Sequence, residues 1–290
     1  MSLAGTLCCQ DGKPTPFAVC EERCRQGGCQ HALPILVNMR KNGERRAGIG
    51  ISSSVLGGCP RQHVLGQRNE YYEDPEDYYA RWFGTFGHYA IEMDGPYPGI
   101  IQEVRFYREV DVDGSLVEVS GQPDWIDLNL GLIADHKMVG KKPYAPRPSH
   151  IRQLNVYRWL VEGGYTKIPY PPGEETRLRP GEYSTWSLPP DSWHNPIPEG
   201  FKVQELEVRY YHPGSKGRHA EFPVPVWPDE SVQNYVVSKL RPFVNYQKTG
   251  NIAPLRVAPG DEWLAGFCPF RHGDNPGACC VAQETPEPPE

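Results

Sequence analysis

The sequence has no long apolar run. Hydrophobic residues make up 38% of its 290 residues, and the mean hydropathy is −0.59. A membrane-spanning helix requires about 20 consecutive apolar residues, and the run from Leu33 to Val37 is too short even for the core of a signal peptide. These absences exclude a spanning helix and predict a cytoplasmic protein with no membrane partner.

A net positive charge is also absent. The chain has 30 Lys and Arg residues against 36 Asp and Glu residues, which gives a net charge of −6. It therefore has no global basic field for nucleic acid, and any basic surface must be local. One segment, residues 141–152, predicts phosphate contacts, and a solvated loop is the alternative reading. Its basic residues are Lys141, Lys142, Arg147, His150 and Arg152.

The nine cysteines lack the regular spacing of a zinc finger. Their odd number argues against a fully paired secreted scaffold, and clustered cysteines in a reducing compartment favour metal over disulfides. Residues 1–32 hold five of them with little apolar periodicity. This predicts an N-terminal arm, residues 1–45, held by zinc, and a disordered arm is the alternative. The two groups of cysteines are Cys8, Cys9, Cys20, Cys24 and Cys29, and Cys59, Cys268, Cys279 and Cys280.

What the sequence does have is a patterned stretch, residues 116–137, which predicts two short strands joined by a turn at Asn129 and Gly131. Alternate residues of a strand share a face, so Asp135 and Lys137 point to one side and His136 points away. With Asp124, two carboxylates and an ammonium then converge. Magnesium and manganese prefer carboxylate ligands, and an ammonium can hold an attacking water. The stretch predicts a phosphodiester-cleaving site, and a hairpin with solvated polar residues is the alternative.

Three other segments offer further donors. A helix that follows Gly84 carries His88, whose neutral imidazole is a suitable ligand for manganese. A strand at residues 100–110 carries Glu103, which could reach the site from this strand, although we expect it to be a solvated edge acid. A helix is expected from about His150 to Val161, with Ser149 as its cap. It places Gln153, Tyr157 and Leu160 on one face. On that face the amide of Gln153 and the phenol of Tyr157 can orient a phosphate or Lys137.

The remaining segments outline the domain organisation. We expect one large domain at residues 46–282, interrupted by an irregular insertion rich in Pro and Gly and followed by a disordered acidic tail. The insertion is residues 163–200, a strand is expected at 201–211, a helix at 229–248, and the tail at 283–290.

Six motifs occur in an order that resembles the RecB-type branch of the PD-(D/E)xK nucleases. The resemblance is closest to its iron-sulfur members, the CRISPR-associated RecB-like exonucleases and the nuclease domain of AddB. It implies an α/β, restriction-endonuclease-like fold, with a central mixed sheet flanked by helices and a C-terminal cysteine-ligated metal cluster. The motifs are Cys59-Pro-Arg61, Gly84-x3-His88, Gly121-x2-Asp124, Asp135-x-Lys137, Gln153-x3-Tyr157 and Trp263 to Cys280.

The resemblance also implies roles for the site residues. Manganese or magnesium would be bound by His88, Asp124, Asp135 and the backbone carbonyl of His136. Lys137 would position or activate the attacking water, and Gln153 and Tyr157 would complete the catalytic site with Asp124 and Asp135. Asp135 stands where many relatives carry Glu.

The cofactor that the resemblance implies is a [4Fe–4S] cluster on Cys59, Cys268, Cys279 and Cys280. The family pattern has a cysteine where this chain has Ala265, so adjacent ligation by Cys279 and Cys280 is needed. The alternatives are His272 or an N-terminal cysteine as the fourth ligand, or zinc in place of the cluster.

The function implied is a metal-dependent DNA exonuclease that prefers single strands and acts in recombination, repair or CRISPR adaptation. A recombination or CRISPR protein partner and a homo-oligomer are consistent with it. The alternatives are a structure-specific endonuclease of the same fold and a non-catalytic DNA-binding subunit.

Overall fold

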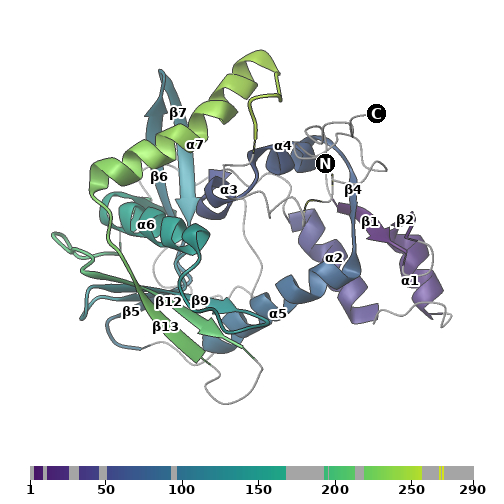
Figure 1. Cartoon of the computed structure of the whole chain (residues 1–290), viewed down its shortest axis with the longest axis horizontal. Helices are drawn as coiled ribbons and strands as arrows, with labels where there is room; N and C mark the ends of the chain where they lie inside the picture. Colours follow the sequence, from purple (N-terminus) through teal and green to yellow (C-terminus); the bar gives the residue numbers. More distant parts are fainter. Residues whose placement is uncertain are drawn as a thin grey trace, which may run out of the picture. The chain divides into compact units, whose positions relative to one another are not determined.

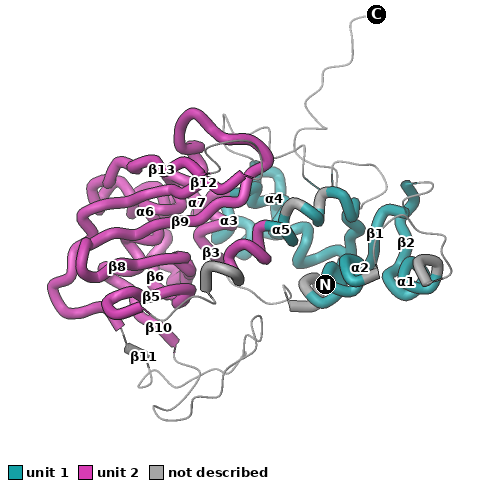
Figure 2. Tube along the Cα trace, turned by 90° about the horizontal axis from the view of Figure 1, so that it is seen from below, with its two compact units in different colours: residues 1–49, 58–83, 242–290 teal, residues 50–57, 84–241 magenta. Residues whose placement is uncertain are grey.

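The chain folds into two compact units (Figures 1 and 2). Unit 1 comprises residues 1–49, 58–83 and 242–290, and unit 2 comprises residues 50–57 and 84–241. The computed structural model describes residues 3–8, 12–25, 33–45, 51–92, 97–167, 193–194, 196–212, 219–256, 268 and 270. Most of the expected insertion, the acidic tail and most of the last motif lie outside these residues. No helix in the described ranges is both long and apolar enough to cross a bilayer.

Unit 1 contains a three-stranded sheet in the order β2-β1-β4, with β1 antiparallel to β2 and parallel to β4. Its elements are β1 (Leu3–Leu7), β2 (Pro14–Pro16), α1 (Phe17–Arg25), α2 (Leu33–Arg45), α4 (Pro60–Arg68) and β4 (Tyr71–Glu73). Two further helices contribute residues to both units, α5 (Pro75–Glu92) and α7 (Asp229–Thr249).

Residues 1–32, in which little apolar periodicity was found, contribute Leu3, Phe17 and Cys20 to a buried core, and Ile35, Leu36 and Met39 are added by α2, beyond that range. Buried residues of β1, α1 and α2 form a hydrophobic cluster that also includes Cys59, Leu65 and Cys268. In α2 the spacing of Ile35, Leu36 and Met39 puts all three on one face. The compact units consequently do not follow the expected boundary at residue 45, because segments distant in sequence bury their apolar side chains together.

Unit 2 is a mixed α/β unit with two five-stranded sheets. One sheet has the order β11-β10-β6-β7-β3, and the other has the order β13-β12-β9-β8-β5. The elements are β3 (Ile51–Ser52), α3 (Ser53–Gly57), β5 (Ile100–Gln102), β6 (Phe106–Val112), β7 (Ser115–Gly121), β8 (Trp125–Asp127), β9 (Leu132–Met138), α6 (Pro148–Gly163), β10 (Tyr165–Lys167), β11 (Trp193–His194), β12 (Glu205–Tyr211) and β13 (His219–Val224).

Residues 116–137 were expected to form two strands, the first of which carries Asp124, but they form three, because β7 pairs with β6 in the other sheet. Asp124 lies in the connection that follows β7, and the hairpin around the predicted turn consists of β8 and β9, which pair antiparallel. The side chain of Asp127 accepts hydrogen bonds from the amides of Asn129 and Leu130 in the turn, and Gly131 ends it with a φ of 65°. On its other side β9 pairs parallel with β12. Because β9 is central, its first residues, Leu132 to Ala134, form a continuous buried run.

Helix α6 packs against strands of both sheets, β6 and β7 in one and β9 and β12 in the other (Figure 1). Its residues from Leu154 to Val161 are all buried, so the helix is enclosed on every side. The helix begins at Pro148, after Arg147 as N-cap, and no side chain caps it. The expected cap at Ser149 was therefore wrong, because proline at the first helical position needs no hydrogen bond to its nitrogen.

Gly121 allows α6 to approach β7 closely. A Cβ atom at Gly121 would lie 2.6 Å from Cδ1 of Leu160 and 2.9 Å from Cδ1 of Tyr157. Both side chains are buried, so neither has room to move away. The glycine of the motif Gly121-x2-Asp124 thus has a packing role that also positions Tyr157.

We expect Gly121→Ala to destabilise the protein by about 1–3 kcal/mol, because it overpacks a filled core. Thermal unfolding followed by circular dichroism measures the effect. Gly84→Ala in α5 is the matched control, because a Cβ there meets nothing within 4 Å and alanine favours the helix by about 1 kcal/mol. Equal melting temperatures for the two variants would contradict the packing role.

Candidate metal centre and its lysine

Asp124 lies in the short connection between β7 and β8 and is 8% exposed. Its Oδ2 accepts a hydrogen bond from the main-chain N–H of His136, with an N–O distance of 2.6 Å. This bond fixes the carboxylate beside the central strand β9. The other oxygen, Oδ1, faces His88 and lies 3.4 Å from its Nδ1.

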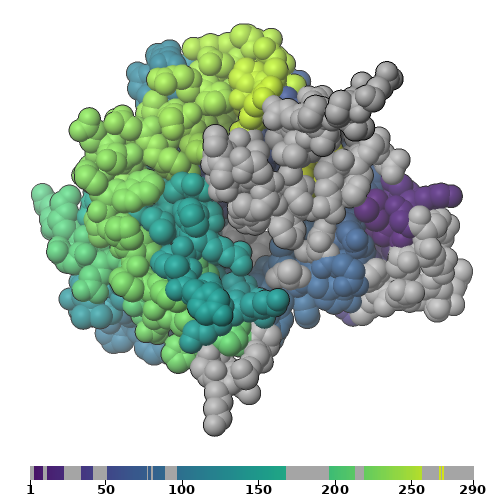
Figure 3. Space-filling model, viewed as in Figure 1, coloured from purple at the N-terminus to yellow at the C-terminus, as the bar shows by residue number. Residues whose placement is uncertain are grey.

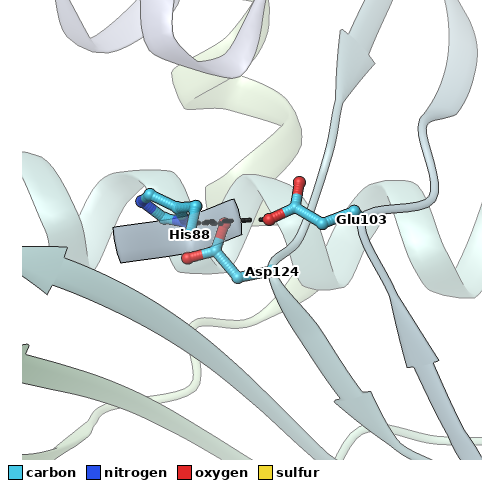
Figure 4. Close-up of side chains that lie close together, drawn as sticks. All are labelled: His88, Glu103 and Asp124. Carbon is cyan, nitrogen blue, oxygen red and sulfur yellow. Dashed lines mark ion pairs between the residues drawn. The ribbon is translucent and has the colours of Figure 1, made fainter. Parts of the chain in front are cut away.

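Three side chains, those of His88, Glu103 and Asp124, converge in unit 2 (Figure 4). Each offers one ligand atom, and these atoms lie within 4.8 Å of one another. The Nδ1 atom of His88 is 3.6 Å from Oε1 of Glu103. One imidazole nitrogen and two carboxylate oxygens suit manganese or magnesium. The group is therefore a candidate site for a divalent cation.

The preferred reading of Glu103 as a solvated edge acid was wrong, and the alternative, that it reaches the site from its strand, agrees with the structure. Its side chain is 20% exposed and faces His88. Its Oε2 accepts a hydrogen bond of 2.7 Å from Nε2 of Gln122, whose Oε1 accepts one of 2.8 Å from Arg105. Glu103 also has a φ of 52°, in the left-handed region, and lies between β5 and β6. The expected single strand is thus two strands, and the break between them turns Glu103 toward the site.

Asp135 and Lys137 lie on the same face of β9, as the alternation of a strand requires. The Nζ atom of Lys137 is 2.9 Å from Oδ1 and 2.8 Å from Oδ2 of Asp135. Asp135 is completely buried. Burial by itself would lower the pKa of Lys137, but the charges of Asp135 and Asp124 outweigh burial and raise the pKa above its usual value.

The ligand set predicted from the resemblance is assembled only in part. Within the described residues, the compact group of potential metal ligands contains His88, Glu103 and Asp124, and it does not contain Asp135. Asp135 nevertheless lies close enough for its charge to act on Asp124. Asp124 thus belongs to the group with His88 and Glu103 and also interacts electrostatically with Asp135 and Lys137.

His136 contributes to the site through its main chain, because its N–H donates a hydrogen bond to the carboxylate of Asp124. Its imidazole stacks on Tyr211 with ring centroids 5.6 Å apart, and its Nδ1 is 2.9 Å from the hydroxyl of Tyr211. Burial, together with the charge of Arg209, lowers the pKa of His136 to about 4. The imidazole is therefore neutral near pH 7 and points away from the site, as the strand alternation predicted.

Gln153 and Tyr157 lie one turn apart on α6, as predicted. Nε2 of Gln153 donates a hydrogen bond of 2.6 Å to the hydroxyl of Tyr157. Burial and the charge of Asp135 raise the pKa of Tyr157 above its usual value, so its hydroxyl keeps its proton. The structure thus places both residues of this motif near the pair of Asp135 and Lys137.

Two of the four predicted cluster cysteines lie in the described part of the chain, Cys59 and Cys268. Both are buried and belong to one hydrophobic cluster in unit 1, together with Cys20. Cys279, Cys280, His272 and Ala265 lie outside the described residues. The predicted [4Fe–4S] cluster and the predicted zinc of the N-terminal arm remain predictions.

Comparisons with known proteins provide information about the fold and none about the function. No protein-family model and no curated protein matches the sequence. Eight chains of solved structures match, among them the one named "Crystal structure of SSO0001". That match has 17% sequence identity and a TM-score of 0.51, and covers 83% of this chain and 95% of the other. The likeness agrees with the mixed α/β architecture.

The raised pKa of Asp124 gives a prediction about pH. Burial, and next the negative charge of Asp135, raise the pKa of Asp124 from 3.8 to about 8. Between pH 4 and 8 the folded chain therefore holds a proton that the unfolded chain releases. This proton stabilises the fold below pH 4, and the stabilisation is lost as the pH rises to about 8, by at most about 1.4 kcal/mol per pH unit.

In EDTA, the melting temperature of the wild type should consequently fall more between pH 5 and 8 than that of Asp124→Asn, which has no such proton. Thermal unfolding at four pH values in this range tests the difference. Parallel curves for the two proteins would show that Asp124 is ionised throughout.

A second prediction concerns Glu103 as a cation ligand. Glu103→Gln keeps the size of the side chain but removes the charge, and should weaken Mn²⁺ binding by about 10-fold or more. Isothermal titration calorimetry with MnCl₂ measures the affinity. Glu109→Gln is the matched control, because Glu109 is exposed on β6. Equal affinities for the two variants would remove Glu103 from the ligand set.

Proposed function

We propose that the chain is a metal-dependent nuclease that hydrolyses phosphodiester bonds of single-stranded DNA from an end. The observation that carries the proposal is the arrangement around Asp124, which is grouped with His88 and Glu103 and also interacts electrostatically with Asp135 and Lys137. The order of the sequence motifs supports the same activity. We also propose that unit 2 has a restriction-endonuclease-like fold, which is consistent with a central strand flanked by one parallel and one antiparallel neighbour.

The donor atoms fit a divalent cation, manganese or magnesium, which would be held by His88, Glu103 and Asp124. A bound cation of this kind lowers the pKa of water and stabilises negative charge on a phosphate. The site is also unfavourable for a second negative charge, because burial and the charge of Asp135 raise the pKa of Asp124. A cation would relieve this repulsion and would displace the proton from Asp124.

Lys137 acts as a charged group and not as a base. Its pKa is raised by Asp135 and Asp124, so the ammonium does not accept a proton near pH 7. It can instead donate hydrogen bonds to the attacking water or to a phosphate oxygen, while Asp135 fixes its position. Tyr157 likewise keeps its proton and can donate, and Gln153 orients its hydroxyl.

We further propose that unit 1 binds an iron-sulfur cluster through Cys59, Cys268, Cys279 and Cys280, with zinc as the alternative metal. The support is that Cys59 and Cys268 are 209 positions apart in the chain and still share one buried cluster with Cys20. Thiolates in such surroundings are suitable ligands for iron-sulfur clusters and for zinc. The role of this cluster would be structural.

The activity is tested by digestion of end-labelled single-stranded DNA with Mn²⁺. We expect Lys137→Ala and Asp124→Asn to lower the turnover number by at least about 100-fold, because the first removes the ammonium that would contact the phosphate or the water and the second removes a ligand of the cation. Lys248→Ala, at an exposed position of α7, should leave it unchanged. The same anaerobic preparation, analysed for iron, sulfide and zinc, identifies the metal of unit 1.

The substrate separates the remaining alternatives. An exonuclease leaves circular single-stranded DNA intact, whereas a structure-specific endonuclease of the same fold cuts it. A wild type that binds DNA but cleaves none with Mn²⁺ or Mg²⁺ would be a binding subunit, and undiminished activity in both site variants would place the catalytic centre elsewhere.

A further inference from the structure

The loop that joins β9 to α6, residues 139–147, presents an aromatic ring to solvent. Tyr144 is 100% exposed, the highest value for a large apolar side chain among the residues that the structure describes. In the space-filling view, the part of the chain between β9 and α6 lies on the visible face, in teal (Figure 3). We name this segment the Tyr144 loop.

The Tyr144 loop is stiff and anchored at both ends. Proline occupies positions 143, 146 and 148, and each proline fixes its φ angle. At the start of the loop the N–H of Val139 donates to the carbonyl of Tyr211, at 2.8 Å. At its end the N–H of Arg147 donates to the hydroxyl of Tyr210, at 3.0 Å. The ring is therefore held out from the surface at little cost in conformational entropy.

The Tyr144 loop and its flanking residues carry a positive net charge, whereas the whole chain is negatively charged. No acidic residue occurs between Asp135 and Glu162, although the chain has a net charge of −6. Three basic side chains of the Tyr144 loop are exposed, Lys141, Lys142 and Arg147. An exposed ring among exposed cations is the combination with which proteins bind single-stranded nucleic acid, by base stacking and by phosphate contacts.

The Tyr144 loop also borders the candidate metal centre. It connects the strand that carries Asp135 and Lys137 to the helix that carries Gln153 and Tyr157. Directly after the loop, Nδ1 of His150 is 2.8 Å from the hydroxyl of Tyr210, the group that also anchors Arg147. After burial, the charge of Lys137 is the next cause of the lowered pKa of His150. The end of the loop is thus within electrostatic range of the site.

We propose that the Tyr144 loop holds single-stranded DNA at the site, with the ring of Tyr144 stacked on an unpaired base and Lys141, Lys142 and Arg147 on the neighbouring phosphates. This inference rests on the proposed nuclease function, and it adds an explanation of why the substrate would be single-stranded. In a duplex the faces of the bases are covered by their neighbours, so the ring has no base to stack on. The Tyr144 loop therefore selects unpaired strands.

Binding of a fluorescein-labelled 20-nucleotide oligothymidine, followed by anisotropy in EDTA so that no cleavage occurs, tests the inference. Tyr144→Ala should raise the Kd roughly 10-fold, and Tyr144→Trp should restore wild-type affinity, because stacking requires only an aromatic face. Leu130→Ala is the matched control, since Leu130 is 64% exposed in the turn between β8 and β9. Its Kd should equal that of the wild type.

Two further measurements separate stacking from charge. With an oligonucleotide of abasic residues, Tyr144→Ala and wild type should bind equally well. Replacing Lys141 and Lys142 by Gln should reduce the slope of log Kd against log salt by about 1 to 2, whereas Tyr144→Ala should leave the slope unchanged. A Kd for Tyr144→Ala equal to that of wild type, or no binding of oligothymidine by the wild type, overturns the inference.

The test distinguishes this inference from the proposed function. If the wild type digests DNA with Mn²⁺ but binds it independently of Tyr144, the nuclease stands and the role of the Tyr144 loop is refuted. If oligothymidine binding depends on Tyr144 but no divalent metal supports cleavage, the DNA contact stands and the nuclease is refuted. A preference for an RNA oligonucleotide of the same length over DNA would overturn the choice of DNA.

Discussion

A completely buried carboxylate in the middle of a sheet constrains unit 2. Asp135 lies on β9, between β8 and β12, and a charge at such a position is costly unless an opposite charge accompanies it. Lys137 supplies that charge because a strand returns to the same face after two residues. Asp124 is also buried and lies near Asp135, and its pKa is raised first by burial and next by the charge of Asp135. A cation held by His88, Glu103 and Asp124, as proposed above, would be stabilised by the charge of these two buried acids.

The backbone of Glu103 is strained, and its neighbours show how this conformation is stabilised. A left-handed φ is unfavourable for a residue with a Cβ, and it persists only where neighbouring contacts hold it. Here the contacts are the hydrogen bond from Gln122 and, behind it, the one from Arg105. Gln122 belongs to the same short connection as Asp124. One connection therefore positions one potential ligand directly and a second through a side chain.

The parts of the site that could be predicted from sequence are those fixed by local periodicity. Asp135 and Lys137 are two residues apart on a strand, and Gln153 and Tyr157 are four apart on a helix, so each pair meets whatever the tertiary structure is. The position of Glu103 depends on a backbone turn and on contacts between strands. Neither of these can be predicted from a local sequence pattern. The core of unit 1 was missed for a similar reason, because Cys59, Leu65 and Cys268 join it from distant segments.

The short side chain of Asp135 relates its contact with Lys137 to the position of Glu103. The resemblance assigns Asp135 to a position where many relatives have Glu, and aspartate is shorter by one methylene. In this structure Asp135 contacts Lys137 and is not part of the compact ligand group, which Glu103 completes instead. Under the proposed function the two acids have separate roles, because Asp135 holds the ammonium of Lys137 and Glu103 would reach the cation. The shorter acid on β9 is then compatible with the site, since the strand break before β6 turns a longer acid toward Asp124 and His88.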